Sequence, residues 1–537
     1  MTFFDIVLAL IYILFSVGWG LWRSLAGARV ASAHGVKAFW LAQKNFSALP
    51  VALTLMATLI SSNTLVSHPG IASSSGLILL PGFFLLPFVL LFAAKKLVPF
   101  YRKHVRLSVY EYLALRFGSL TQAYASTGFV VDRLFDMAVT LVTCGIFVQV
   151  LVGMPLWLAM IAILGLTIMY VLIGGIAAVV WNDALQSVVL ILGGVVVVSI
   201  ISFAPFNAWL IAWEGGRFSL GDWSVSGSML SPSASSSPWL IMLAMSIIWA
   251  RKFWCDQTMV QRYLIASSHA EAAQGLHLAA LMIVLILFVF NVVGAGLWGF
   301  YQGAGSYSVS DVHPFYSTVI PSVRDQIMPH FVLHYFPLGA KGIMLAAVVA
   351  AAMSSLSSDV NGVASVLYHN WVSCQNSMQA PSYSTRSQSS LRREWISRLL
   401  ILLAGLCVLV IALHLVPDST SGPLAMRVIA IASALSGAVL GVFCLAYFTI
   451  RATKHGALLG LVAGSLMGLW AVLTAGESAP WADVSWRFPL NVLLSGVLAQ
   501  WVVIAVGYFV SVSFTWAKAS SAQLQAVRVY TIWAKNN

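Results

Sequence analysis

The chain has 537 residues, of which 60% are hydrophobic and only 8% are charged. Soluble domains carry about 25% charged residues, so this composition, with a mean hydropathy of +0.91, excludes a soluble globular protein and predicts an integral membrane protein. The formal net charge of +12 does not indicate nucleic-acid binding, because no basic stripe with interleaved aromatic residues accompanies it.

Hydrophobic stretches of membrane-spanning length predict about 13 transmembrane helices. We expect them near residues 4–22, 48–66, 77–98, 125–150, 154–173, 183–204, 238–255, 276–301, 340–370, 397–416, 424–449, 456–475 and 488–514. Placing the N-terminus outside assigns most of the 28 Lys and Arg residues to inner loops, as the positive-inside rule requires. The sequence therefore predicts a multi-pass protein of the plasma membrane, or of the inner membrane if the source is bacterial, with a cytoplasmic C-terminus.

The second of these stretches contains an interruption. Its apolar part is followed by Ser61, Ser62, Asn63 and Thr64, and a proline and a glycine come a few residues later. The proline and glycine could simply end the helix. Polar residues well inside a span are also typical of an unwound segment, whose freed carbonyl groups can coordinate an ion and whose half-helix ends can meet a solute. We predict the unwound segment.

Five ionisable residues fall within or at the edge of predicted spans, where an uncompensated charge is costly. They are Asp132, Arg133, Asp136, Asp183 and Asp359. Arg133 is adjacent to one aspartate and three residues from another, so it either forms a local ion pair or contacts an anionic solute. Asp183 either caps a helix N-terminus or binds a cation, because no basic residue lies near it in the sequence.

The stretch 346–361 changes from small apolar residues to four serines and an aspartate. In a helix, one of its faces becomes a row of oxygens at i, i+3, i+4 and i+7, formed by Ala351, Ser354, Ser355 and Ser358 with Ser357 beside them. Such a face suits a hard monovalent cation. It also suits close helix packing, with each hydroxyl bonded back to a carbonyl of its own helix.

No motif points to covalent chemistry. The chain has no phosphate-binding glycine loop, no HExxH or GxSxG motif and no soluble domain after the last span, and its five cysteines form no CxxC pair. We therefore expect a protein that is not an enzyme and needs no cofactor.

Four motifs, spread in order over nearly the whole chain, resemble those of the sodium:solute symporter family, which includes sodium/glucose, sodium/proline and sodium/sialic acid transporters. They are Gly174–Gln186 (GG-x-x-AV-x-x-(T)D-x-x-Q), Asp256–Tyr263 (DQ-x-x-VQR), Ala352–Ser358 and Arg451–Gly460 (RA-x-x-x-GA-x-x-G). The chain departs from the family pattern at Asn182, where threonine is usual. Residues 76–87 also lack the Glu or Gln that several sugar and sialic acid carriers use on their substrate.

The resemblance implies an all-α, LeuT-type core of two inverted five-helix repeats. The chain then divides into an extra span and cytoplasmic loop (1–47), the first repeat (48–204), an outer Ser-rich loop (205–237), the second repeat with one further span (238–475), the last span (476–514) and a cytoplasmic tail (515–537).

The resemblance also implies ion and solute sites. The family's common sodium site matches the carbonyls of Ala57, Ile60 and Ala351 and the hydroxyls of Ser354 and Ser355. A second sodium site, present in some members, matches Asp183, Ser354, Ser357 and Ser358. We expect the solute to contact Ser61, Ser62, Asn63, Thr64, Arg133, Trp249, Ser433 and Ser436, with an interfacial belt position as the alternative for the tryptophan.

The function we predict is sodium-coupled secondary active symport, importing a small polar organic solute of the sugar, sialic acid or carboxylate class by alternating access. Sodium ions serve as coupling ions, the lipid bilayer is the surroundings, no nucleic acid is involved, and a monomer suffices. The alternatives are a proton-coupled symporter of the same fold, a membrane sensor and a channel.

Overall fold

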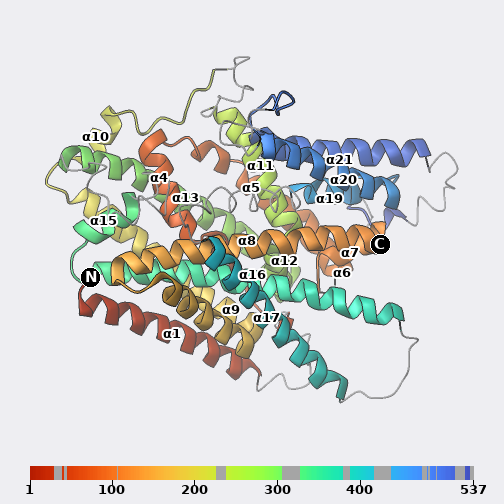
Figure 1. Cartoon of the computed structure of the whole chain (residues 1–537), viewed down its shortest axis with the longest axis horizontal. Helices are drawn as coiled ribbons and strands as arrows, with labels where there is room; N and C mark the ends of the chain where they lie inside the picture. The colour runs from red at the N-terminus through yellow and green to blue at the C-terminus, as the bar shows by residue number, and fades with distance from the viewer. Residues whose placement is uncertain are drawn as a thin grey trace.

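A computed structural model of the chain describes residues 1–28, 39–40, 45–105, 107–224, 237–304, 327–378, 388–415, 437–474, 481, 484–491, 493–514 and 527–532. In these ranges the protein is helical, and the one β-type contact is an isolated bridge between Phe46 and Ala266. Figure 1 shows several of the longest helices, among them α8 (Ser119–Val152), α20 (Lys454–Thr474) and α21 (Leu493–Phe514), running along the long axis of the molecule.

The first half of the chain contains two short non-α helices besides its α-helices. The elements before residue 224 are α1 (Phe3–Ala28), α3 (Ala48–Leu59), α4 (Ser62–Ser75), the 3-10 helix η2 (Leu80–Phe83), α5 (Leu86–Phe92), the π-helix η3 (Ala93–Leu97), α6 (Val98–His104), α7 (Tyr110–Phe117), α8, α9 (Leu156–Ser202) and α10 (Ala208–Glu214). The helix α10 lies inside the segment predicted to be an outer loop, and it places a short helix there.

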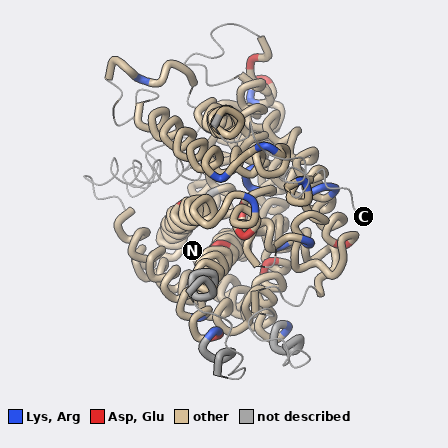
Figure 2. The backbone as a smooth tube through the Cα atoms, turned by 90° about the vertical axis from the view of Figure 1, so that its right-hand side faces the viewer, with Lys and Arg blue, Asp and Glu red and all other residues tan. Residues whose placement is uncertain are grey.

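All the helices described in the second half of the chain are α-helices. Its helices are α11 (Pro238–Cys255), α12 (Gln257–Leu264), α13 (His269–Ala304), α15 (Ile327–Tyr335), α16 (Ala340–Met378), α17 (Gln388–Leu415), α19 (Val439–Phe448), α20 and α21. Figure 2, turned by 90° from Figure 1, shows several helices of the molecule end-on, as expected for a bundle that crosses a membrane.

Length and composition allow 9 of the described helices to cross a membrane, or 10 if the bent pair α3 and α4 counts as one span. The helix α9 alone corresponds to two predicted spans, because it bends at Gly175, where φ is +55°. A side chain at Gly175 would stand 2.6 Å from the carbonyl oxygen of Phe39, so only glycine fits this bend. The multi-pass architecture is thus present, although the exact number of predicted spans is not confirmed.

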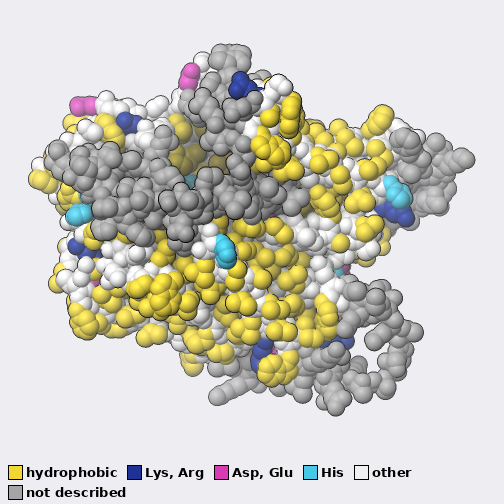
Figure 3. Space-filling view, in the orientation of Figure 1, with side chains coloured by type: hydrophobic (Ala, Val, Ile, Leu, Met, Phe, Trp, Pro, Cys, Tyr) yellow, Lys and Arg dark blue, Asp and Glu magenta, His cyan; other side chains and the backbone are white. Residues whose placement is uncertain are grey.

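The outer surface of the bundle is apolar. Figure 3 shows hydrophobic side chains over much of the face in view, with few charged ones among them. Exposed apolar side chains include Leu281, Leu285 and Phe288 on α13, which are 68%, 59% and 48% exposed. A face of this kind is stable against lipid chains and unfavourable in water.

At the centre of the molecule lies α16. In the most apolar 18-residue stretch of this helix, 94% of the residues are buried. The helix packs against α1, α3, α8, α9, α12 and α17. A second group of helices, α3, α4, α5, α11 and η2, gathers around α13 or around one another. The two groups meet where α3 contacts α9 and α16, which is also where the predicted ion ligands lie.

Candidate functional site

The break in the second predicted span is present. The helix α3 ends at Leu59 and α4 begins at Ser62, and their axes differ by 62°. Between them Ile60 and Ser61 have extended backbone (ψ 97° and 172°). Because their backbone leaves the helix, nearby carbonyl groups lose their intrahelical partners and become available to a ligand. The break is shorter than predicted, since the helix continues through Pro69 to Ser75.

The serine row on α16 faces the end of α3. The hydroxyl of Ser354 lies 2.8 Å from the carbonyl oxygen of Ala57 and 3.0 Å from that of Ala351, and it donates a hydrogen bond toward each. The hydroxyl of Ser355 lies 3.4 Å from the carbonyl oxygen of Thr58. Three predicted ligand oxygens of the first sodium site therefore converge on one point. The other two predicted ligand residues, Ser355 and Ile60, the residue that follows α3, are also buried.

The residues predicted for the second sodium site also lie together, one turn further along α16. Ser357 donates to the carbonyl oxygen of Ser354 (3.0 Å), and the hydroxyls of Ser358 and Thr58 are 2.9 Å apart. Asp183 lies close by, because its Oδ2 accepts a hydrogen bond of 2.5 Å from Thr54. These side chains form a buried polar cluster between α3, α9 and α16.

Asp183 has a basic partner, contrary to the reasoning from the sequence. The Nη2 atom of Arg262 lies 3.5 Å from its Oδ2, and neither side chain is exposed. This arginine belongs to the DQ-x-x-VQR motif, 79 residues away, which is why inspection of neighbouring residues missed it. The helix-cap alternative is excluded, because Asp183 lies inside α9, well past the bend at Gly175.

The predicted solute residues are only partly described. Ser62 is buried and lies 3.3 Å from the carbonyl oxygen of Thr140 on α8, while Ser61 and Thr64 are half-buried at the break. The side chain of Asn63 lies outside the described part of the chain, as do Ser433 and Ser436.

Trp249 does not occupy a lipid-facing belt position. It is 8% exposed, its indole N–H donates to the carbonyl oxygen of Gly82 (3.1 Å), and its ring lies 6.0 Å from that of Phe83. Phe83 also stacks on His68, which is hydrogen-bonded to Asn291 (3.2 Å). The sequence alone assigns no role to His68.

Arg133 is held by four carboxylates. Its guanidinium lies 2.7 Å from both Asp132 and Asp136, and 3.9 and 3.8 Å from Asp256 and Asp359. The local ion pair considered as an alternative is therefore present, and the condition for an anion-binding role, an arginine not already paired, is not met.

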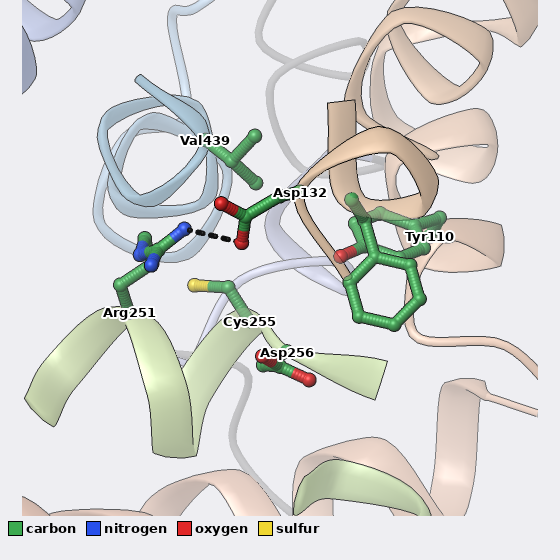
Figure 4. Close-up of a pocket in the computed structure, with 7 residues that line it drawn as sticks. Tyr110, Asp132, Arg251, Cys255, Asp256 and Val439 are labelled. Atoms are coloured by element: carbon green, nitrogen blue, oxygen red, sulfur yellow. Dashed lines mark hydrogen bonds and ion pairs between the residues drawn. The ribbon is translucent and has the colours of Figure 1, made fainter. Parts of the chain in front are cut away.

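Beside this cluster lies a small pocket between α7, α8, α11 and α19. Its lining residues are Tyr110, Phe129, Asp132, Arg251, Cys255, Asp256 and Val439. Figure 4 shows Arg251 and Asp132 facing each other across it, at 3.3 Å, with the thiol of Cys255 directed between them. The pocket is lined by both charged and apolar groups.

This fold, with a broken helix opposite a buried serine row, is that of a sodium-coupled transporter. Residues 39–464 match the model of the sodium:solute symporter family, and the chain belongs to this family. The recognition made from the four motifs is confirmed. The family consists of transporters, so the expectation that the chain is not an enzyme is confirmed as well.

Three transporters illustrate the relationship. The chain is 28% identical to sodium-coupled monocarboxylate transporter 2 of Danio rerio, over 81% of this chain and 66% of the relative. It is 27% identical to sodium-coupled monocarboxylate transporter 1 of Mus musculus, over 89% and 74%, and 28% identical to sodium/myo-inositol cotransporter 2 of Rattus norvegicus, over 87% and 69%.

A solved structure shares the fold. A sodium-coupled sialic acid symporter in a substrate-bound, outward-open state superimposes with a TM-score of 0.79 at 22% identity, over 96% of this chain and 98% of that one. The predicted all-α, LeuT-type fold class is thereby confirmed. At the level of the family, sodium-coupled symport of a small solute is supported too.

Proposed function

We propose that the protein imports a small polar organic solute, of the sugar, sialic acid or carboxylate class, together with sodium by alternating access. The observation that carries this proposal is the meeting of Ser354, Ala57 and Ala351, where a serine hydroxyl and two carbonyl oxygens lie within 3.0 Å at the end of a broken helix. Uncharged oxygens at such a point can replace the water shell of a monovalent cation.

In the proposed first site, sodium is bound by the carbonyls of Ala57, Ile60 and Ala351 and the hydroxyls of Ser354 and Ser355. The ion links α3 to α16, and so it orders the break between α3 and α4. Because the solute is expected to contact residues at that break, an ordered break raises the population of the solute-binding state. The inward movement of each sodium ion then contributes about 2.3 kcal/mol per 100 mV of membrane potential.

A second sodium ion is proposed at Asp183, with Ser354, Ser357 and Ser358. The proposed solute-contacting residues are Ser61, Ser62, Asn63, Thr64 and Trp249, together with Ser433 and Ser436. Arg133 is left out of the cavity because its charge is already neutralised. We further propose that the protein acts as a monomer in the plasma membrane, or a bacterial inner membrane, with its N-terminus outside and its C-terminus in the cytoplasm.

A proton-coupled symporter of the same fold is the second candidate. The observation in its favour is Asp183, a completely buried carboxylate. Among the described residues it has one ion pair, a single contact of 3.5 Å with Arg262. Such a group can exchange a proton instead of a sodium ion.

One experiment tests both candidates. Purified protein in proteoliposomes takes up radiolabelled monocarboxylates, myo-inositol, sialic acids, sugars, amino acids and vitamins under an imposed sodium gradient, a proton gradient, or neither. We expect accumulation of one class under the sodium gradient alone. Accumulation under the proton gradient without sodium would replace the first candidate by the second, and solute flux without accumulation would refute symport.

A further inference from the structure

The short helix α12 is fixed to the middle of α16 by a row of buried polar contacts. Each polar side chain on its α16-facing side meets a partner on that helix: Gln257 to Ser365 (3.2 Å), Thr258 to Asp359 (2.9 Å) and Gln261 to Asn361 (3.2 Å). All six residues are buried. Movement of α12 away from α16 would therefore leave a series of polar groups without partners, unless water or ions reach them.

Arg262, near the end of α12, is completely buried. Its Nε donates to the hydroxyl of Thr58 (2.6 Å), and its Nη2 donates to the hydroxyl of Ser358 and lies 3.5 Å from Asp183. The guanidinium thus contacts two of the residues proposed to hold the second sodium ion. A sodium ion and a guanidinium next to each other in this buried cluster would repel each other strongly.

The contact between Arg262 and Asp183 has the geometry of an exchangeable pair. It is a single contact at 3.5 Å rather than two short parallel hydrogen bonds, which is the strong arrangement of an arginine with a carboxylate. Within the described part of the chain, Oδ1 of Asp183 and Nη1 of Arg262 have no hydrogen-bond partner. Each group therefore keeps one polar atom that is not used in the contact between them.

We propose that Arg262 is a tethered counter-ion, which takes the place of the second sodium ion at Asp183 whenever the carrier is free of sodium. A symporter must return to its starting state without its ions, and a buried carboxylate without a counter-ion would oppose that step. With Arg262 in place, the return step carries a neutral pair. Sodium binding from outside displaces the guanidinium, and so it weakens the attachment of α12 to α16. This inference rests on the proposed sodium-coupled function.

The test compares two modes of transport by the full-length protein in proteoliposomes. Net uptake requires the return of the sodium-free carrier, whereas exchange of labelled for unlabelled solute, with saturating sodium on both sides, does not. We expect Arg262→Gln to lower net uptake relative to exchange by at least about fivefold, the lower end of typical coupling between two ligands. Arg262→Lys, which keeps a cation on α12, should retain most of the wild-type ratio.

A binding measurement gives a second readout. Because Arg262 competes with sodium, its removal should lower the sodium concentration that half-saturates the rise in thermal unfolding temperature, again by about fivefold. An arginine that only supports the structure of the site would instead raise that concentration when it is removed. Asp183→Asn combined with Arg262→Gln removes both charges, and it should restore the ratio of net uptake to exchange.

Thr258→Val is the matched control on the same helix. It removes the hydrogen bond to Asp359 without changing a charge, so the ratio should stay at the wild-type value. Equal loss of net uptake and exchange in Arg262→Gln, or a lowered ratio in Thr258→Val, would overturn the counter-ion role while the sodium dependence of the wild type stands. Wild-type transport that does not respond to sodium would refute the proposed function and this inference together.

Discussion

Ser354→Ala provides the most direct test of the first sodium site. The substitution deletes one oxygen that is proposed to serve both sodium ions, and it removes the donor that now lies 2.8 Å from Ala57 and 3.0 Å from Ala351. Alanine fits the space, because Ser354 is buried among small residues of a helix that is otherwise rich in alanine. The loss is therefore one of coordination rather than of packing.

The expected magnitude follows from the contacts. Sodium would lose one of five proposed oxygen ligands, and a buried polar interaction of this kind contributes about 1–3 kcal/mol. Since 1.4 kcal/mol corresponds to a factor of ten, the sodium concentration that half-saturates transport should rise about fivefold or more. The measurement is initial uptake of the identified solute in proteoliposomes against sodium concentration, together with sodium-dependent thermal unfolding of the same variant.

Ser397→Ala is the control for this substitution. Ser397 is also a buried serine on a long helix, α17, and its hydroxyl bonds back to the carbonyl oxygen of Arg393 (3.0 Å), far from the proposed ions. It should leave the sodium dependence unchanged. The reasoning fails if Ser354→Ala folds normally and its half-saturating sodium concentration equals that of the wild type.

Three further predictions follow from the remaining proposed residues. Asn63→Cys should react with thiol reagents and be protected by the transported solute; a cysteine that never reacts, or reacts without protection, counts against the cavity at the break. Asp183→Asn should shift the reversal potential of the proteoliposomes from two sodium ions per solute toward one, and an identical ratio in wild type and variant would remove the second site. Arg133→Gln should lower the free energy of unfolding by about 3–5 kcal/mol, because it removes the ion-pair partner of the buried Asp359 and one of the cations beside Asp132 and Asp256, while the solute concentration for half-maximal uptake stays the same; a large change in that concentration with unchanged stability would return Arg133 to the solute site.

The features that depend on one helix were accessible from the sequence. The i, i+3, i+4, i+7 spacing from Ala351 to Ser358 determines which side chains share a face, and the structure places that face against α3. The interruption at Ser61 was visible because polar residues inside an apolar span are unfavourable unless the backbone there has a special role. The pair of Arg133 with Asp136 was visible for the same reason, since three residues separate them along one helix.

Contacts between helices were not accessible in this way. Periodicity describes the faces of a single helix, but it does not say which other helix lies against each face. Arg262 and Asp183 are 79 residues apart, and no local pattern connects them. The same holds for Thr54 and Thr58, whose spacing of four residues marks a shared face on α3 but not its neighbours, Asp183 and Ser358.

The arrangement of the two proposed ion sites makes cooperative binding a physical expectation. Ser354 belongs to both sites, and the serines of the two sites lie on successive turns of α16. The apolar part of this helix is almost entirely buried and packs against several other helices. An ion in the first site fixes α3 against α16, and this also fixes Thr54 and Thr58, which contact Asp183 and Ser358. The conformational entropy of the second site has then already been lost before the second ion binds. The two ions are therefore expected to bind with positive cooperativity, since the shared framework of α3 and α16 has to be ordered only once.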